Sequence, residues 1–142
     1  MPNTSPNLIA AGDIRPNRYV KIDSTAGNSH YGLEADANEK VIGICGGETT
    51  QPPLSDLVTT ALHASSGKHI HLYGDGDECL LEISATVVQG DRLKSDGDGK
   101  GTPVATSGTT LQEYGAIALE AGSSGDKIRV QVTLGSVRPA IA

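Results

Sequence analysis

The chain has 142 residues, a formal net charge of -6 and an apolar content of 37%. This length suits a single domain with one hydrophobic core. The acidic balance and the absence of any run of Lys and Arg argue against binding to nucleic acid, whose phosphates require clustered positive charge. No segment is long and apolar enough to cross a bilayer. We therefore expect neither nucleic acid nor a membrane as a partner.

The composition favours β structure with many tight turns. The chain contains 18 Gly and 7 Pro, and its only aromatic residues are four Tyr. The glycines lie between short runs of Val, Ile and Leu, which is typical of strands joined by turns. We predict an all-β fold, a small β-barrel or β-sandwich, whose core is built from Ile, Val, Leu and Ala.

The first eleven residues differ from the rest of the chain. Met1–Ala11 contains two prolines and has no hydrophobic period, so we expect an extended arm that precedes a single β-rich domain over 12–142. The arm lacks the charged start and long apolar stretch of a signal peptide. Synthesis in a reducing cytoplasm is therefore expected, with Cys45 and Cys79 as free thiols.

Strand candidates follow one another along the chain. The segment 18–23 alternates apolar and polar residues, which predicts a half-buried strand, and the more continuous apolar run 40–45 predicts a more deeply buried one. The segment 69–73 also alternates and ends at the turn cluster Gly74–Asp77, so we predict a β-hairpin with 79–85. Further strands are expected at 92–95, 103–105, 116–120 and 128–134.

One segment has helical spacing. After Pro52 and Pro53, apolar residues recur three and four positions apart, which predicts at most one short helix near residues 54–64. The alternative is an irregular segment, because Thr59 and Thr60 are β-branched and disfavour a helix.

The order of these strand candidates repeats. Three segments of the first part of the chain resemble three segments of the second part, in the same order, which predicts two pseudo-repeated halves. The matched segments are 12–23 with 90–96, 41–44 with 115–119, and 69–73 with 127–132.

No pattern of catalytic or metal-binding residues emerges. His69 and His71 project from one face of a strand, but no third and fourth ligand follows at a characteristic spacing. The segment 96–101 begins like a calcium loop, yet Lys100 occupies a ligand position and Ser107 stands where a Glu is required. Nucleophile elbows and phosphate-binding loops are also missing. We therefore predict a non-enzymatic protein without a cofactor or a metal.

The ordered motifs together resemble a known family. The chain is similar to the capsid decoration, or cement, proteins of tailed bacteriophages, most clearly in its closing pattern over 115–122 and 125–132. Earlier parts of the resemblance are 18–22, 41–44, and 71–74 leading to 90–97. It implies a structural virion protein on the outer capsid surface, bound to the major capsid protein and bridging its subunits. It also implies a homo-oligomer, with a trimer favoured over a dimer.

A flexible arm suits such a role, because several weak contacts on one oligomer act together. We expect the arm to contact the capsid or a sister subunit. The predicted contact residues are Pro2, Asn3, Pro6, Leu8 and Ile9.

The alternative is a small β-rich module that binds carbohydrate or another cell-surface ligand. Sugar sites favour aromatic platforms, for which the chain offers Tyr19, Tyr31, Tyr73 and Tyr114. A hydrolase would have to use His63, His69 or His71.

Overall fold

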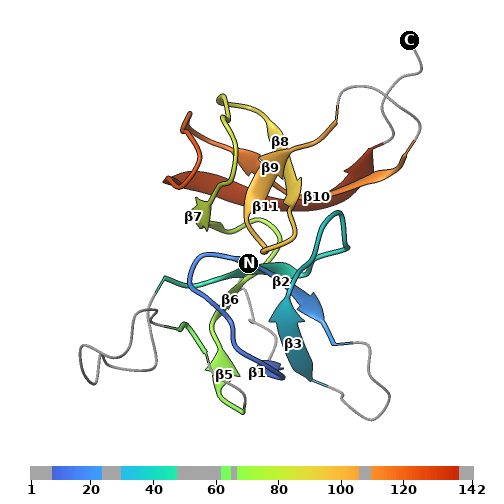
Figure 1. Ribbon diagram of the computed structural model, residues 1–142, viewed down its shortest axis with the longest axis vertical. Helices are drawn as coiled ribbons and strands as arrows, with labels where there is room; N and C mark the ends of the chain where they lie inside the picture. The colour runs from blue at the N-terminus through green and yellow to red at the C-terminus, as the bar shows by residue number, and fades with distance from the viewer. Residues whose placement is uncertain (1–7, 24–29, 48–61, 65–66, 106–109, 138–142) are drawn as a thin grey trace.

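The computed structural model describes residues 8–23, 30–47, 62–64, 67–105 and 110–137, and all regular elements in these ranges are β-strands. Two curled sheets lie one above the other (Figure 1). Among the described residues there is no helix that could cross a membrane. The strands are β1 Leu8–Ala10, β2 Tyr19–Ile22, β3 Tyr31–Glu34, β4 Gly43–Cys45, β5 His69–Ile70, β6 Leu72–Tyr73, β7 Glu78–Glu82, β8 Arg92–Ser95, β9 Gly101–Pro103, β10 Gln112–Ala118 and β11 Lys127–Val137.

The first sheet is nearly a closed barrel. Its six strands have the order β5-β1-β3-β2-β4-β6, so β5 and β6 stand at opposite ends of the order. These two strands are nevertheless consecutive in the chain and separated only by His71. The segment 69–73 therefore pairs with β1 through its first part and with β4 through its second, and this closes the sheet.

The second sheet curls in the same way. Its five strands have the order β7-β11-β10-β8-β9, and a parallel bridge between Ile83, just after β7, and Gly101 of β9 joins the two ends of that order. We call residues 8–73 the first half and residues 78–137 the second half.

The register of the two sheets confirms the predicted repeat. Val20 of β2 pairs with Gly43 and Glu34, and at the same places Leu93 of β8 pairs with Ala116 and Pro103. The first half also contains a parallel β1–β3 pair, which corresponds to the Ile83–Gly101 bridge. An antiparallel bridge between Ile14 and Ala64 corresponds to the one between Val87 and Gly122.

The turns of the two halves agree as well. Asn17 has a φ of 56° in the turn before β2, and Gly90 has a φ of 94° in the turn before β8. A left-handed backbone is accessible to Gly and is tolerated by Asn. The two halves thus make the same turn with different residues, and only Asn17 brings a side chain to it.

Two clusters of buried apolar side chains hold the fold together. One fills the first barrel, and the other fills the second sheet and continues across the seam between the halves to Tyr19, Ala35, Val41 and Ile44 of the first half. Because successive residues of a strand face opposite sides, Tyr19 and Ile44 belong to the shared cluster while Val20 and Cys45 belong to the barrel. The first barrel contains Leu8, Ala10, Ile14, Val20, Cys45, Ala64, Ile70 and Leu72.

Burial on both faces explains the apolar run 40–45. Gly43, Ile44 and Cys45 of β4 are all buried, as predicted for that segment. A strand covered on both sides does not need the polar alternation of a surface strand. β8 has the predicted bounds 92–95, and the predicted strands at 18–23, 116–120 and 128–134 are present with shifted ends. β9 lies slightly before the predicted 103–105.

The predicted hairpin between 69–73 and 79–85 is wrong. β6 pairs with β4 of the first sheet, whereas β7 pairs with β11 of the second. The turn cluster Gly74–Asp77 therefore carries the chain from one half to the other. Gly and Asp mark a tight turn in both cases, but the local sequence does not specify which strands pair across it.

The N-terminal boundary of the folded part and the predicted helix are the remaining predictions. The folded part begins at Leu8 rather than at residue 12, because β1 pairs with β3 and β5 and buries Leu8 and Ala10. The predicted helix near 54–64 lies mostly outside the described residues. Within that segment, Ala64 is described and forms the bridge with Ile14.

Candidate interaction surfaces

A network of charged side chains joins the two halves. The guanidinium of Arg18, which is almost completely buried, donates a hydrogen bond to the carbonyl oxygen of Asp98 at 2.9 Å and lies 3.5 Å from the Glu82 carboxylate. Lys100 contacts the other oxygen of Glu82 at 3.3 Å. Since burial strips Arg18 of water, these partners in the second half supply the negative charge that it needs. Its Nε has no hydrogen-bond partner.

Arg15 adds a second connection. Its Nε and Nη2 donate to the two carboxylate oxygens of Glu34 at 3.0 and 2.8 Å, a bidentate geometry, and Nη2 also lies 3.6 Å from the Asp98 carboxylate. Hydrogen bonding to Glu34 raises the pKa of Arg15 further above its already high ordinary value. Arg15 and Arg18 together hold the 96–100 loop against the first half.

Tyr19 extends from β2 into the interior of the second half. Its ring is fully buried, and its hydroxyl donates a 2.7 Å hydrogen bond to the carbonyl oxygen of Leu93. Burial raises the pKa of this hydroxyl well above its ordinary value. Space for the ring comes from Gly115, where a Cβ atom would lie only 2.6 Å from Tyr19 Cε1 and 2.5 Å from Val41 Cγ2.

Side-chain amides cover exposed strand edges at the seam. Asn38, with a φ of 54°, donates from Nδ2 to the Leu111 carbonyl oxygen at 3.0 Å and accepts from the Glu113 N–H at 3.0 Å, as a neighbouring strand would. Asn17 does the same for β7, because its side chain donates to the Leu80 carbonyl oxygen and its own carbonyl accepts from Glu82 N–H. Unpaired edges invite association with other strands, so these contacts protect the sheet.

The described surface includes three hollows near the seam and β2. One, of about 460 Å³, lies beside β2 and the segment before β4; another, of about 300 Å³, lies between that segment and the ribbon formed by the ends of β10 and β11; a third, of about 280 Å³, lies on the seam. The first is lined by Lys21, Ile22, Glu39, Lys40 and Ile42. The second is lined by Lys40, Val41, Glu113, Tyr114, Leu134, Gly135 and Ser136. The third is lined by Asn17, Gly47, Tyr73, Glu78, Cys79, Leu80 and Arg129.

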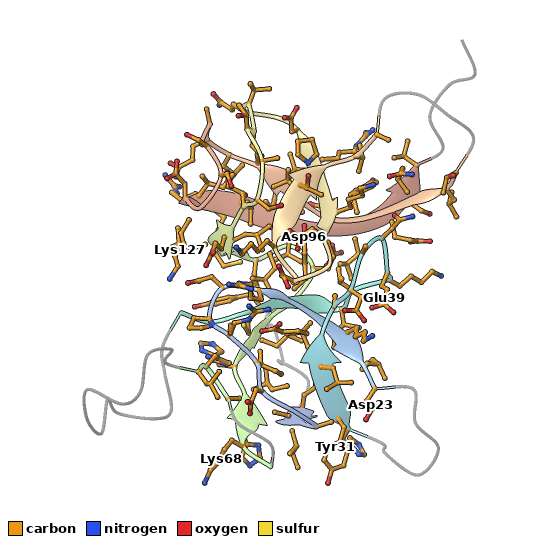
Figure 2. All side chains as sticks on the ribbon, viewed as in Figure 1. Asp23, Tyr31, Glu39, Lys68, Asp96 and Lys127 are labelled. Carbon is orange, nitrogen blue, oxygen red and sulfur yellow. The ribbon has the colours of Figure 1, made fainter. Side chains whose placement is uncertain are left out.

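The largest of these three hollows combines an apolar floor with a charged rim. Ile22 has 48% of its surface exposed there, which is unusual for a large aliphatic side chain. Lys21 Nζ lies 2.8 Å from Glu39 and 3.4 Å from Asp36. The hydrogen bond between Lys21 and Glu39 raises the pKa of Lys21 and lowers the pKa of Glu39. Glu39 stands on the side of the first half that faces the β10–β11 ribbon (Figure 2).

The predicted contact residues of the arm separate into three groups. Leu8 is 4% exposed and belongs to the core of the first barrel, so it is not a surface contact residue. Ile9 faces the other side of β1 and is half-buried. Pro2, Asn3 and Pro6 lie outside the described residues. The sequence assigns Leu8 to the arm because three alternating residues, 8–10, are too few to distinguish a strand from an irregular segment.

The four tyrosines do not form a common platform. Tyr19 is buried in the core, and Tyr31 lies at the end of the first half away from the seam (Figure 2). Tyr73 stands beside His71, with their ring centroids 4.9 Å apart, and Tyr114 lies 5.3 Å beneath the guanidinium of Arg92. The carbohydrate alternative thus loses Tyr19 as a platform.

The histidines and cysteines are dispersed. His63 is buried and its Nε2 accepts the N–H of His71 at 3.0 Å, while the side chains of His69 and His71 are exposed. Cys45 and Cys79 are free thiols, as predicted, and burial raises the pKa of each to about 12. In the described ranges, no three His, Cys, Asp or Glu side chains gather in a geometry that could hold a metal ion.

The segment that begins like a calcium loop has another use. Asp96 Oδ1 accepts the N–H groups of Asp98 and Lys100 at 2.8 and 2.9 Å, which folds the loop on itself at the level of the seam (Figure 2). Asp98 then faces Arg15 and Arg18. The loop is therefore part of the connection between the halves, a role that the local sequence does not indicate.

Comparison with known proteins finds a likeness among solved structures. No family model matches the chain, and no curated protein matches it. Among solved structures, it is similar to the N-terminal base of the head fiber protein gp8.5 of bacteriophage phi29, with a TM-score of 0.59 and 14% sequence identity. The likeness covers 89% of this chain and 91% of the other. At this identity, the similarity shows a shared fold.

Proposed function

We propose that this chain is a structural protein of a tailed-phage virion that binds the outer capsid surface and stabilises the shell by bridging major capsid protein subunits. The observation that carries the proposal is the similarity of fold to a phage head fiber base over nearly the full length of both chains. The family resemblance of the sequence supports the same class of protein independently of that comparison.

The contacts between the two halves support a role in which the protein transmits force between capsid subunits. Arg15, Arg18, Tyr19 and Asn38 of the first half all contact the second half through hydrogen bonds or ion pairs. A bridge between capsid subunits must transmit force without opening along its own seam. A shared core combined with buried polar contacts makes relative motion of the halves costly.

The oligomer and the arm complete the proposal. A trimer at a capsid symmetry axis would multiply weak contacts into stable binding. The segment 1–7, including Pro2, Asn3 and Pro6, is the proposed contact with the capsid or with a sister subunit, and Ile9 is the candidate at its base. Leu8 is removed from this set because it belongs to the core.

Co-sedimentation with capsid shells that lack this protein tests the proposal. We expect saturable binding of the full chain, added density on the outer shell in electron micrographs, and shells that withstand higher temperatures before rupture. A variant lacking residues 2–7 should bind fewer sites, whereas Leu80→Asp, changed at an exposed side chain of β7, serves as a control. Absence of binding by the full chain would refute the proposed function.

A further inference from the structure

Because the two halves share their strand pairing, the contact between them identifies the corresponding surfaces on each half. In the second half, the contact surface lies along β8 and β10, and we call it the mouth of that half. At the mouth, the carbonyl oxygen of Ser95 accepts the N–H of Asn38 at 2.9 Å, and the N–H of Glu113 donates to Asn38 Oδ1. Gly115 leaves room there for the Tyr19 ring. The mouth is thus filled by side chains of the first half, chiefly Tyr19 and Val41, which we call its plug.

The first half has a mouth of its own at the corresponding positions. Ile22 pairs with Gly32 as Ser95 pairs with Gly101, so Ile22 corresponds to Ser95. Ile42 precedes Gly43 as Gly115 precedes Ala116, and Lys40 lies two residues earlier, as Glu113 does. All three side chains, Ile22, Lys40 and Ile42, line the 460 Å³ hollow.

The second half likewise carries a plug. Tyr19 pairs with Ile44 and Arg92 pairs with Ile117, so Arg92 stands where Tyr19 stands in the first half. Val41 lies two residues before Gly43 and Tyr114 lies two residues before Ala116, so Tyr114 corresponds to Val41. Arg92 is exposed, and its guanidinium lies over the Tyr114 ring at 5.3 Å. One chain therefore contains two mouths and two plugs, of which one pair is used internally.

We propose that the open mouth of the first half receives the Arg92–Tyr114 plug of a second copy of this chain, in a head-to-tail contact. The open mouth and the Arg92–Tyr114 plug differ from the mouth and plug of the internal contact, and the two differences complement each other. Gly115 admits a deep aromatic ring in the internal contact, whereas Ile42 occupies that space in the open mouth. A long, flexible Arg in place of Tyr19 lies across such a shallower floor instead of entering it.

The open mouth offers polar and apolar contacts to the same occupant. The rim of the open mouth carries two carboxylates, those of Asp36, with 71% of its side chain exposed, and Glu39, with 38% exposed, together with Lys21, which pairs with both, and Lys40. In this contact the guanidinium of Arg92 donates hydrogen bonds to the exposed carboxylate oxygens, and its stem covers the exposed surface of Ile22.

Head-to-tail contacts between identical chains have a geometric consequence. They are heterologous, so they generate a closed ring when the rotation between copies closes and an open array when it does not. A ring of three copies would account for the trimer proposed above. The inference does not require capsid binding, because it concerns the chain with itself.

Light scattering after size-exclusion chromatography of the full chain over a range of concentrations tests the contact. The unaltered chain should form oligomers. Ile22→Asp in the mouth and Arg92→Glu in the plug should each reduce the mass to that of a monomer, while Leu80→Asp, also at an exposed apolar position, should leave the oligomer intact. Circular dichroism melts confirm that each variant remains folded.

Mixing the two variants tests whether the mouth of one copy receives the plug of another. Ile22→Asp retains an intact plug and Arg92→Glu retains an intact mouth, so an equimolar mixture should form a dimer joined by one good contact. A monomeric unaltered chain, an oligomer insensitive to both substitutions, or a mixture that stays monomeric would overturn the proposal. If the unaltered chain does not bind capsid shells but the mixture still forms the dimer, only the proposed function is refuted.

Discussion

The two halves share a strand order but differ in what fills them. The interior of the second half is continuous with the seam, and side chains of the first half complete it. The interior of the first half is a separate, smaller cluster that includes Ala10, Cys45 and Ala64. A duplicated topology has therefore produced one half that is completed by its neighbour and one that retains an exposed hollow. The difference teaches that a repeat conserves strand pairing more readily than it conserves side-chain packing.

The largest effect on this comparison should come from Tyr19, the side chain that the second half borrows from the first. Tyr19→Ala removes a fully buried ring and its hydrogen bond, so we expect a loss of about 3–5 kcal/mol in the free energy of unfolding. Urea unfolding measures this loss. Tyr31→Ala, at a half-buried position of β3 away from the seam, is the control, and equal losses would show that Tyr19 has no special role.

Gly115 tests the fit between the same two surfaces from the other side. An added methyl group would lie 2.5 Å from Val41 Cγ2 and 2.6 Å from Tyr19 Cε1. Gly115→Ala should therefore destabilise the fold by about 1–3 kcal/mol, as overpacking generally does. Gly97→Ala is the matched control, because a Cβ atom there has no neighbour within 4 Å. Thermal melts that shift equally for both variants would contradict this packing.

Asn38 separates hydrogen bonding from backbone conformation at the seam. Asn38→Gly keeps the left-handed backbone and removes two side-chain hydrogen bonds, which should lower the free energy of unfolding by about 1–2 kcal/mol. Asn38→Ala should cost roughly a further 1 kcal/mol, because Ala disfavours a φ of 54°. Denaturant titrations of both variants provide the comparison. Equal stabilities would mean that the backbone conformation relaxes.

The smallest effect concerns the thiol inside the first barrel. Burial raises the pKa of Cys45 from 9.0 to about 12, so the folded chain keeps the thiol protonated after the unfolded chain has begun to ionise. Its contribution is complete below pH 9 and is lost as the pH rises from 9 towards 12, by at most ~1.4 kcal/mol for each pH unit. Cys45→Ala should have a flatter stability profile over this range. A profile parallel to that of the unaltered chain would exclude this linkage.

The candidate surfaces were predicted less well than the fold. Sequence spacing placed His69 and His71 on one strand, but the structure divides this segment between β5 and β6 at His71, because the sheet closes there. Leu8 and Ile9 were both assigned to a contact arm, yet only Ile9 keeps part of its surface. Neither Arg92 nor the Ile22 hollow was singled out, since an exposed Arg and an alternating Ile look ordinary until the repeat is superposed on the sheet register.

The sequence by itself determined the all-β class, the approximate positions of most strands, the free thiols and the order of the repeat. These depend on local periodicity and on turn residues, which act over a few neighbouring positions. Only the tertiary structure decided that 69–73 closes the first sheet, that the turn after Tyr73 crosses between halves, and that Tyr19 completes the second core. Strand partners and shared cores join residues far apart in the chain, and short Gly-punctuated strands carry too little local information to choose among them.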